Sequence, residues 1–145
     1  MNKELARKKI LVIDDEPELL ALMMEVLEDE GYQAFSAANG ADGIRLNELE
    51  NPDLIILDLR MPEMDGIETL RQIRKKDDKV KVVILTGYGS PDTIRDAADL
   101  DVSEYLSKPF ENDQLVRIIS AALYHPWPSS LAELGQADRQ MEEPK

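Results

Sequence analysis

Residues 53–66 read DLIILDLRMPEMDG, and this stretch decides the fold of the chain. Four apolar residues, Leu54 to Leu57, run directly into the carboxylate of Asp58, and a proline and a glycine follow. A continuous apolar run of this length predicts a strand that is covered on both faces. Because burying a lone charge is costly, Asp58 is expected at the end of that strand, where solvent or a partner reaches it.

Four further apolar runs predict four more strands. The five predicted strands are Ile10–Ile13, Gln33–Ala37, Leu54–Leu57, Val82–Leu85 and Val102–Leu106. Between these runs, apolar residues recur with helical spacing, as at Leu19, Met23 and Val26. Alternation of strands and helices predicts one α/β domain, in which a parallel sheet with right-handed crossovers carries helices on both faces.

Start and stop signals indicate five helices. Gly31 suits the position after the first helix, and Ser90 followed by Pro91 suits the start of the fourth. The remaining helices are predicted from Asn39-Gly40 to before Pro52, from about Asp65 to about Lys76, and through Leu115, Ile118, Ile119 and Ala122. After Tyr124 the pattern breaks, so residues 125–145 are interpreted as a linker or C-terminal tail with at most one short helix.

The composition limits the chemistry. The 145 residues include no cysteine and a single histidine, His125, which excludes thiolate sites and clusters of imidazole ligands. The net charge of −13, from 17 basic and 30 acidic residues, argues against direct binding to nucleic acid or to an anionic membrane. No apolar run is long enough for a signal peptide or a membrane span, so a cytoplasmic protein is expected.

Polar residues follow several of the predicted strands. Asp14 and Asp15 follow the first, Thr86 the fourth and Lys108 the fifth. The carboxyl ends of parallel strands meet at one edge, so these residues are expected to converge on Asp58. Two carboxylates about 4 Å apart repel by about 4 kcal/mol at an effective dielectric near 20, so three of them need a cation. Oxygen ligands favour Mg²⁺ or Mn²⁺, and a phosphoryl group suits such a site.

Each of these residues also has a simpler interpretation. An Asp-Asp pair after a strand often caps a helix, and a lone Asp such as Asp58 often lies in a turn. Thr86-Gly87 is a common turn, and Lys108 taken alone would be a solvated surface lysine. Such residues at the ends of four strands favour one shared site over four coincidences.

Four segments together resemble the receiver domain of two-component response regulators. They are ILVIDDEP at 10–17, PDLIILDLRMPEMDGIE at 52–68, VVILTGYG at 82–89 and YLSKPF at 105–110. The resemblance covers residues 8 to about 123. It implies a flavodoxin-like sheet with strand order 2-1-3-4-5, five helices, and a receiver domain at residues 8–124.

The resemblance implies roles for the acidic residues. Asp58 is the implied phosphoacceptor. Asp14 and Asp15, with Asp58 and the backbone carbonyl of Arg60, are the implied ligands of Mg²⁺, for which Mn²⁺ is a possible substitute. The implied phosphoryl donor is a phosphohistidine of a sensor histidine kinase or phosphotransfer protein, or a small acyl phosphate.

The resemblance also implies a switch. Thr86 and Lys108 would bind the phosphoryl oxygens, Thr86 and Tyr105 would change position on phosphorylation, and the bond between Lys108 and Pro109 would be cis. The fourth helix, fifth strand and fifth helix would then form the output face and a possible homodimer interface. Such a domain phosphorylates itself and has autophosphatase activity, but it is not a turnover enzyme. Asp101-Val102 stands where many receivers have Gly-Ala, so this turn is expected to be strained or differently shaped.

Three alternatives differ from this interpretation. A phosphatase with an aspartyl nucleophile usually has a second carboxylate two residues later, where this chain has Arg60. A nucleotide- or flavin-binding protein would be expected to have glycine in the first loop, whereas this loop, DDEPE, is acidic and has none. A receiver that serves only for docking would bind Mg²⁺ without being phosphorylated.

Overall fold

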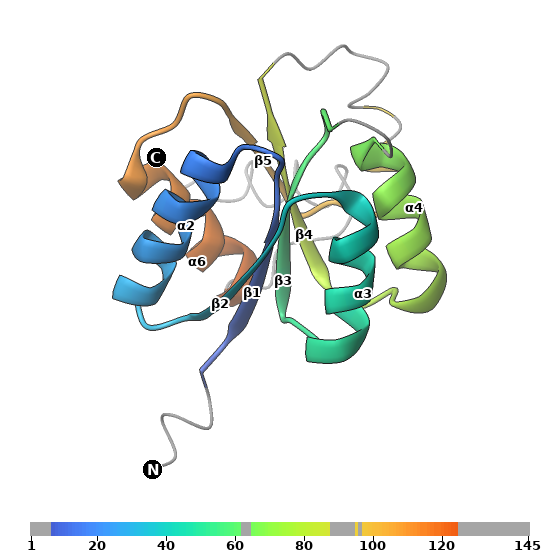
Figure 1. The fold of residues 1–145 in the computed structure, drawn as a ribbon, viewed down its shortest axis with the longest axis horizontal. Coiled ribbons are helices and arrows are strands. Elements are labelled where there is room, and N and C mark those ends of the chain that lie inside the picture. The colour runs from blue at the N-terminus through green and yellow to red at the C-terminus, as the bar shows by residue number, and fades with distance from the viewer. Residues whose placement is uncertain (1–6, 62–64, 88–94, 96, 125–145) are drawn as a thin grey trace, which may run out of the picture.

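A five-stranded parallel sheet forms the centre of the molecule (Figure 1). The computed structural model describes residues 7–61, 65–87, 95 and 97–124. The strands are β1 (Lys9–Ile13), β2 (Gln33–Ala37), β3 (Leu54–Asp58), β4 (Lys81–Thr86) and β5 (Glu104–Ser107). Their order is β2-β1-β3-β4-β5 and every neighbouring pair is parallel, which confirms the predicted fold class.

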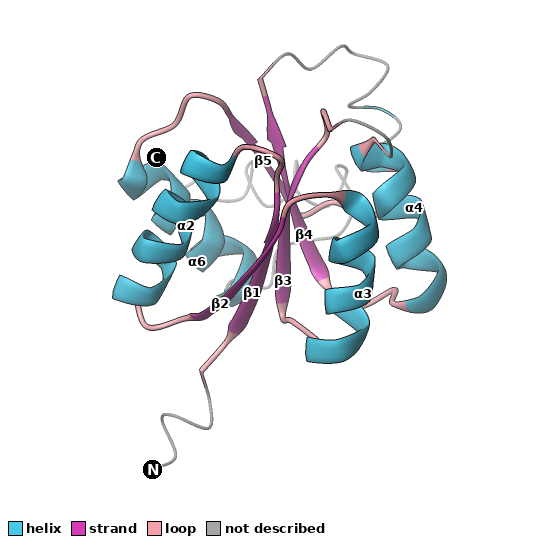
Figure 2. Ribbon diagram, viewed as in Figure 1, coloured by secondary structure: helices cyan, strands magenta, loops and turns pink. Residues whose placement is uncertain are grey.

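Helices cover both faces of the sheet (Figure 2). They are α2 (Pro17–Asp29), α3 (Gly40–Glu50), α4 (Gly66–Lys76) and α6 (Asn112–Tyr124). Figure 1 shows α2 and α6 on one face and α3 and α4 on the other. The helix predicted to begin at Ser90-Pro91 starts outside the described residues, although residues 97 and 98 are helical. The predicted tail at 125–145 also lies outside them. Within the described residues, no helix has the length and apolar character needed to cross a membrane.

The two central strands explain why the sequence has continuous apolar runs. Alternate residues of β1 and β3 face opposite layers, and both layers are closed by helices. Ile10 and Ile56 pack with residues of α2 and α6, whereas Leu11 and Ile55 pack with residues of α4. Every residue from Leu54 to Asp58 is buried. Asp58 is therefore a buried carboxylate at the end of a fully covered strand.

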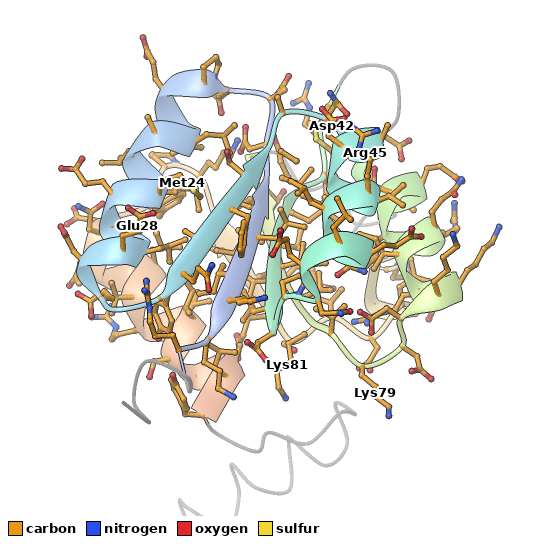
Figure 3. All side chains as sticks on the ribbon, turned by 60° about the horizontal axis from the view of Figure 1, so that its bottom comes forward. Met24, Glu28, Asp42, Arg45, Lys79 and Lys81 are labelled. Atoms are coloured by element: carbon orange, nitrogen blue, oxygen red, sulfur yellow. The ribbon has the colours of Figure 1, made fainter. Side chains whose placement is uncertain are left out.

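Side-chain caps begin two of the helices. Asn39 accepts a hydrogen bond from the backbone N–H of Asp42 at 2.8 Å, and Asp65 accepts one from that of Glu68 at 2.8 Å. Figure 3 shows Asp42 beside Arg45 on the first turns of α3, where the two form an ion pair. These caps agree with the predicted helix starts and fix how the chain leaves β2 and enters α4.

The start of β5 differs from the sequence prediction. The strand begins at Glu104 and not at Val102. Asp101 has a left-handed backbone with φ of 64°, and the pairing with β4 begins only with a hydrogen bond from Ser103 N to Val82 O at 2.8 Å. The side chain of Arg74 donates to the carbonyls of Leu100 and Asp101, both at 2.8 Å, and so holds this turn against α4. Val102 and Ser103, which the sequence prediction had assigned to the strand, therefore precede it.

Close packing at Gly66 ties α4 to the end of β3. A Cβ atom at Gly66 would lie 2.5 Å from the carbonyl oxygen of Asp58 and 2.5 Å from Cα of Leu59. Both are backbone atoms and cannot rotate away. The absence of a side chain at Gly66 therefore lets the start of α4 pack directly on the backbone of Asp58 and Leu59.

We expect Gly66→Ala to destabilise the protein by about 1–3 kcal/mol, the usual cost of overpacking. The measurement is urea unfolding followed by circular dichroism. Gly87→Ala is the matched control, because a Cβ atom there meets none of the described residues within 4 Å. The control should change stability by less than about 0.5 kcal/mol. Equal stability of the two variants would contradict the packing argument.

Candidate functional site

The sheet register brings three aspartates together at the carboxyl edge. Ile13 and Leu57 are paired across β1 and β3, so Asp14 and Asp58, which follow them in the sequence, are neighbours. Each of Asp14, Asp15 and Asp58 offers a carboxylate oxygen, and these atoms lie within 4.8 Å of one another. Asp14 and Asp58 are buried, whereas Asp15 is exposed. The sequence prediction that these carboxylates converge is confirmed.

Backbone hydrogen bonds orient the two buried carboxylates. Asp14 Oδ1 accepts from the N–H of Glu16 at 2.9 Å, and Asp58 Oδ1 accepts from the N–H of Arg60 at 3.0 Å. In both cases an aspartate side chain bonds the backbone two residues further on, a common arrangement in turns. One oxygen of each carboxylate is thus fixed, and both Oδ2 atoms remain for other partners.

Lys108 supplies the positive charge at this edge. Its Nζ lies 2.8 Å from Glu16 Oε1, 2.9 Å from Asp14 Oδ2 and 3.2 Å from Asp58 Oδ2. The backbone N–H of Lys108 donates to the carbonyl of Thr86 at 2.8 Å, which anchors the residue beyond the end of β5. The peptide bond between Lys108 and Pro109 is cis, the configuration that the resemblance implies.

The electrostatics of the site follow from this arrangement. Burial alone would lower the pKa of Lys108, but its contacts with Glu16 and Asp14 and the charges of Asp14 and Asp58 together raise that pKa above its usual value. Lys108 is therefore a permanent cation at neutral pH. Burial raises the pKa of Asp14, and the hydrogen bond from Glu16 and the proximity of Lys108 offset only part of that rise.

Lys79 and Lys81 lie too far away to neutralise the cluster (Figure 3). Figure 3 shows Lys79 and Lys81 pointing outward near the start of β4. Lys81 is the first residue of that strand and Thr86 its last, so these lysines lie at the opposite edge of the sheet. Among the described residues, Lys108 is the only cation that forms an ion pair with Asp14 or Asp58.

The residues present fit a divalent cation. Asp14 Oδ2 is buried and accepts no hydrogen bond of good geometry among the described residues, although Lys108 Nζ lies 2.9 Å away. A buried carboxylate oxygen without a hydrogen bond is costly, and a metal ion would satisfy it. Together with Asp15 and Asp58 it forms an all-oxygen donor set, the kind that suits Mg²⁺.

The two residues predicted to act as a switch lie beside this edge. Thr86 ends β4, pairs with Ser107 and is half-buried. Tyr105 pairs with Ile84 and is half-buried against the core layer of α4, and this burial raises its pKa. The structure thus places Thr86 at the carboxyl edge and Tyr105 two residues before the end of β5.

Glu16 is the site residue that sequence reasoning missed. It is the N-cap residue of α2, yet its side chain makes no capping hydrogen bond and instead contacts Lys108. The available signal was a third acidic residue in the DDE segment, facing a lysine at the end of another strand.

The comparison with protein families agrees with this geometry. Residues 10–120 match the model of the response regulator receiver domain. The chain belongs to the response regulator receiver family. Receiver domains are signalling modules and are generally not turnover enzymes; they interact with histidine kinases or phosphotransfer proteins and generally bind Mg²⁺ at an acidic site.

Individual relatives support the assignment. The receiver chain is 40% identical over 108 residues to sporulation initiation phosphotransferase F of Bacillus subtilis, covering 74% of this chain and 87% of that protein. It is 40% identical over 122 residues to the transcriptional regulatory protein GlrR of Escherichia coli, covering 83% of this chain and 27% of that protein. The chain therefore spans about a quarter of that regulator's length.

Solved structures show the same fold. The receiver superposes on the chemotaxis protein CheY4 of Vibrio cholerae with a TM-score of 0.78 and 27% identity, covering 81% of this chain and 100% of that one. A response regulator receiver domain protein from Clostridium thermocellum gives a TM-score of 0.73 and 30% identity, over 92% of this chain and 99% of that one.

We expect Asp14→Asn to stabilise the receiver at pH 7 by about 0.5–2 kcal/mol when divalent cations are absent. A carboxyl whose folded-state pKa exceeds its unfolded value holds its proton more tightly when folded. Its ionisation therefore costs stability as the pH rises from the unfolded value of about 3.9 through the folded value. The gain should vanish below about pH 3, where both states are protonated.

Urea unfolding of the two proteins at a series of pH values checks this expectation. Asp15→Asn is the matched control, because it removes the same charge from an exposed position. A variant that is less stable than the wild type at pH 7 would show that Asp14 contributes more through Lys108 than its burial costs.

Proposed function

We propose that this chain accepts a phosphoryl group on Asp58 and relays a signal in a two-component phosphorelay. The observation that carries the proposal is the position of Asp58 Oδ2, 3.2 Å from the ammonium of Lys108 and within the cluster of three carboxylates. A carboxylate so placed has a cation ready for the charge that a phosphoryl group brings. Membership of the receiver family supports the same chemistry.

Each side chain has a defined task in the proposed transfer. Asp58 Oδ1 is held by the N–H of Arg60, so Oδ2 is the oxygen that attacks phosphorus. As the new P–O bond forms, the P–N bond of a phosphohistidine breaks and its electron pair leaves with the imidazole nitrogen. Lys108 pairs with the incoming phosphoryl oxygens as a point charge, and the Thr86 hydroxyl bonds one of them. Such transfer needs positioning and charge neutralisation more than covalent help.

A divalent cation completes the charge balance. Asp14, Asp15, Asp58 and the backbone carbonyl of Arg60 are the proposed ligands of Mg²⁺, with Mn²⁺ as a substitute. When bound, the ion would neutralise the negative charge shared by the carboxylates and the phosphoryl oxygens. In the proposed autophosphatase reaction water attacks phosphorus, the P–O bond to Asp58 breaks, and the free carboxylate and inorganic phosphate are released.

The proposed output is a population shift between two packings. Phosphorylation replaces one carboxylate charge at Asp58 by about −1.5 to −2. Thr86 moves toward the new group and Tyr105 turns inward behind it, which alters the face formed by the helix before β5, β5 itself and α6. The phosphoryl group must interact differently with the two packings for this shift to occur.

The proposed partners follow from the family. The phosphoryl donor is a sensor histidine kinase or a phosphotransfer protein, and the same output face could form a homodimer. We assign the receiver to residues 8–124 and a linker or tail to residues 125–145, in a cytoplasmic protein. The net charge of −13 disfavours direct contact of this chain with nucleic acid or membrane.

Intact-mass spectrometry tests the proposal. After incubation with acetyl phosphate and Mg²⁺, the wild type should gain the mass of one phosphoryl group, and Asp58→Ala should gain none. A chelator should abolish the gain. Asp65→Ala is the control, because Asp65 is an exposed aspartate that caps α4 and is not part of the carboxylate cluster among the described residues. The proposal would be contradicted if the wild type bound Mg²⁺ but was phosphorylated neither by acetyl phosphate nor by a histidine kinase. Only a docking role would then remain.

A further inference from the structure

Among the described residues, Glu16 makes the shortest ion pair of the Lys108 ammonium. Its Oε1 lies 2.8 Å from Lys108 Nζ, compared with 2.9 Å for Asp14 Oδ2 and 3.2 Å for Asp58 Oδ2. The two residues are 92 positions apart in the chain, so the fold alone brings them together. This contact has no part in the proposed metal cluster, which consists of the three aspartates.

The local structure frees the Glu16 side chain for this contact. Glu16 is the N-cap residue of α2, and its carbonyl accepts from the N–H of Leu20 at 3.0 Å. Its side chain makes no capping hydrogen bond. A glutamate is an uncommon N-cap, because serine, threonine, aspartate and asparagine fill that position better. The carboxylate therefore adds little to helix capping and is directed to Lys108 instead.

The Lys108 ammonium already donates hydrogen bonds to Glu16 and Asp58 before any phosphoryl group arrives. An ammonium has three N–H donors, and three carboxylates surround this one. Mg²⁺ and Lys108 formally balance the three aspartates, so Glu16 adds a negative charge beyond that balance. A phosphoryl group on Asp58 adds yet more negative charge and requires donors of its own.

Only one of the three carboxylates can leave at small cost. The side chain of Asp14 is 0% exposed and that of Asp58 is 5% exposed, whereas that of Glu16 is 60% exposed. An open groove of about 1040 Å³, lined by Glu16, Leu19, Leu22 and Phe110 among others, adjoins the glutamate. Glu16 can therefore turn into solvent without burying an unpaired charge.

We propose that Glu16 competes with the phosphoryl group for Lys108. In the unphosphorylated protein Glu16 holds the lysine and occupies one of its donors. On phosphorylation Glu16 gives up that donor and turns into the groove, and the phosphoryl oxygens take its place. Glu16 is thus a positioning residue that acts through Lys108 and slows acceptance of the phosphoryl group. This inference rests on the proposed function of Asp58.

Three single substitutions separate this competition from a general charge effect. Glu16→Gln removes the competing charge. Glu16→Asp keeps the charge but shortens the side chain by about 1.5 Å, which takes it out of contact with Lys108. Glu18→Gln is the matched control, because it removes the same charge from the first turn of α2 without a contact to Lys108 among the described residues. Equal melting temperatures confirm that all variants are folded.

The rate of phosphorylation by acetyl phosphate with Mg²⁺, followed by intact mass, is the first readout. The dissociation constant of beryllium fluoride, a phosphoryl mimic that needs no transfer, is the second. Glu16→Gln and Glu16→Asp should both accelerate phosphorylation and tighten beryllium fluoride binding by about three- to fivefold, the strength usual for an exposed ion pair. Glu18→Gln should remain within about twofold of the wild type.

The outcomes are distinguishable. If Glu16→Asp behaves as the wild type while Glu16→Gln is faster, the effect is one of charge alone and the competition is refuted. If Glu16→Gln equals Glu18→Gln, Glu16 has no special role. If the wild type acquires no phosphoryl group at Asp58 from any donor, the proposed function fails, and the inference fails with it.

Discussion

The contact between the Lys108 ammonium and the two buried carboxylates, Asp14 and Asp58, is the constraint on which the rest of the structure depends. Two adjacent strands end in acids that have almost no access to solvent, and such acids repel each other strongly. The sheet tolerates them because Lys108, the residue after β5, extends past the end of β4 and places its ammonium beside both carboxylates. This contact depends on the strand order, in which β3 lies between β1 and β4. The backbone N–H of Lys108 donates to the carbonyl of Thr86 at the end of β4, which holds the lysine near the two acids.

Lys108 neutralises the negative charge of the surrounding carboxylates only in part. One lysine faces three carboxylates, burial raises the pKa of Asp14, and its Oδ2 has no well-formed hydrogen bond among the described residues. A site selected for stability alone would place an amide or an apolar side chain here. In the proposed function this cost is one of pre-organisation, because a cation and a phosphoryl group would meet their ligands and donors already in position.

Much of the fold could be predicted from the sequence, and the failures have physical causes. Continuous apolar runs identified the strands because the sheet is covered on both faces, and Asn39 and Asp65 marked helix starts because their caps are local. The strand order, by contrast, came from the family resemblance. The start of β5 was misplaced, since Arg74 and the left-handed Asp101 hold Val102 out of the strand through contacts distant in sequence. The Glu16–Lys108 pair was missed for the same reason.

The residues around the site divide by how easily they can move. Asp14 and Asp58 are fixed by backbone N–H groups and by the closed layers above and below them. Glu16 and Lys108 are 92 positions apart in the chain, and the glutamate is largely exposed. Glu16 can therefore change its hydrogen-bond partner without disturbing the two buried aspartates or the core around them. The two residues of the proposed switch, Thr86 and Tyr105, lie on β4 and β5, and Tyr105 packs in the same layer as α4.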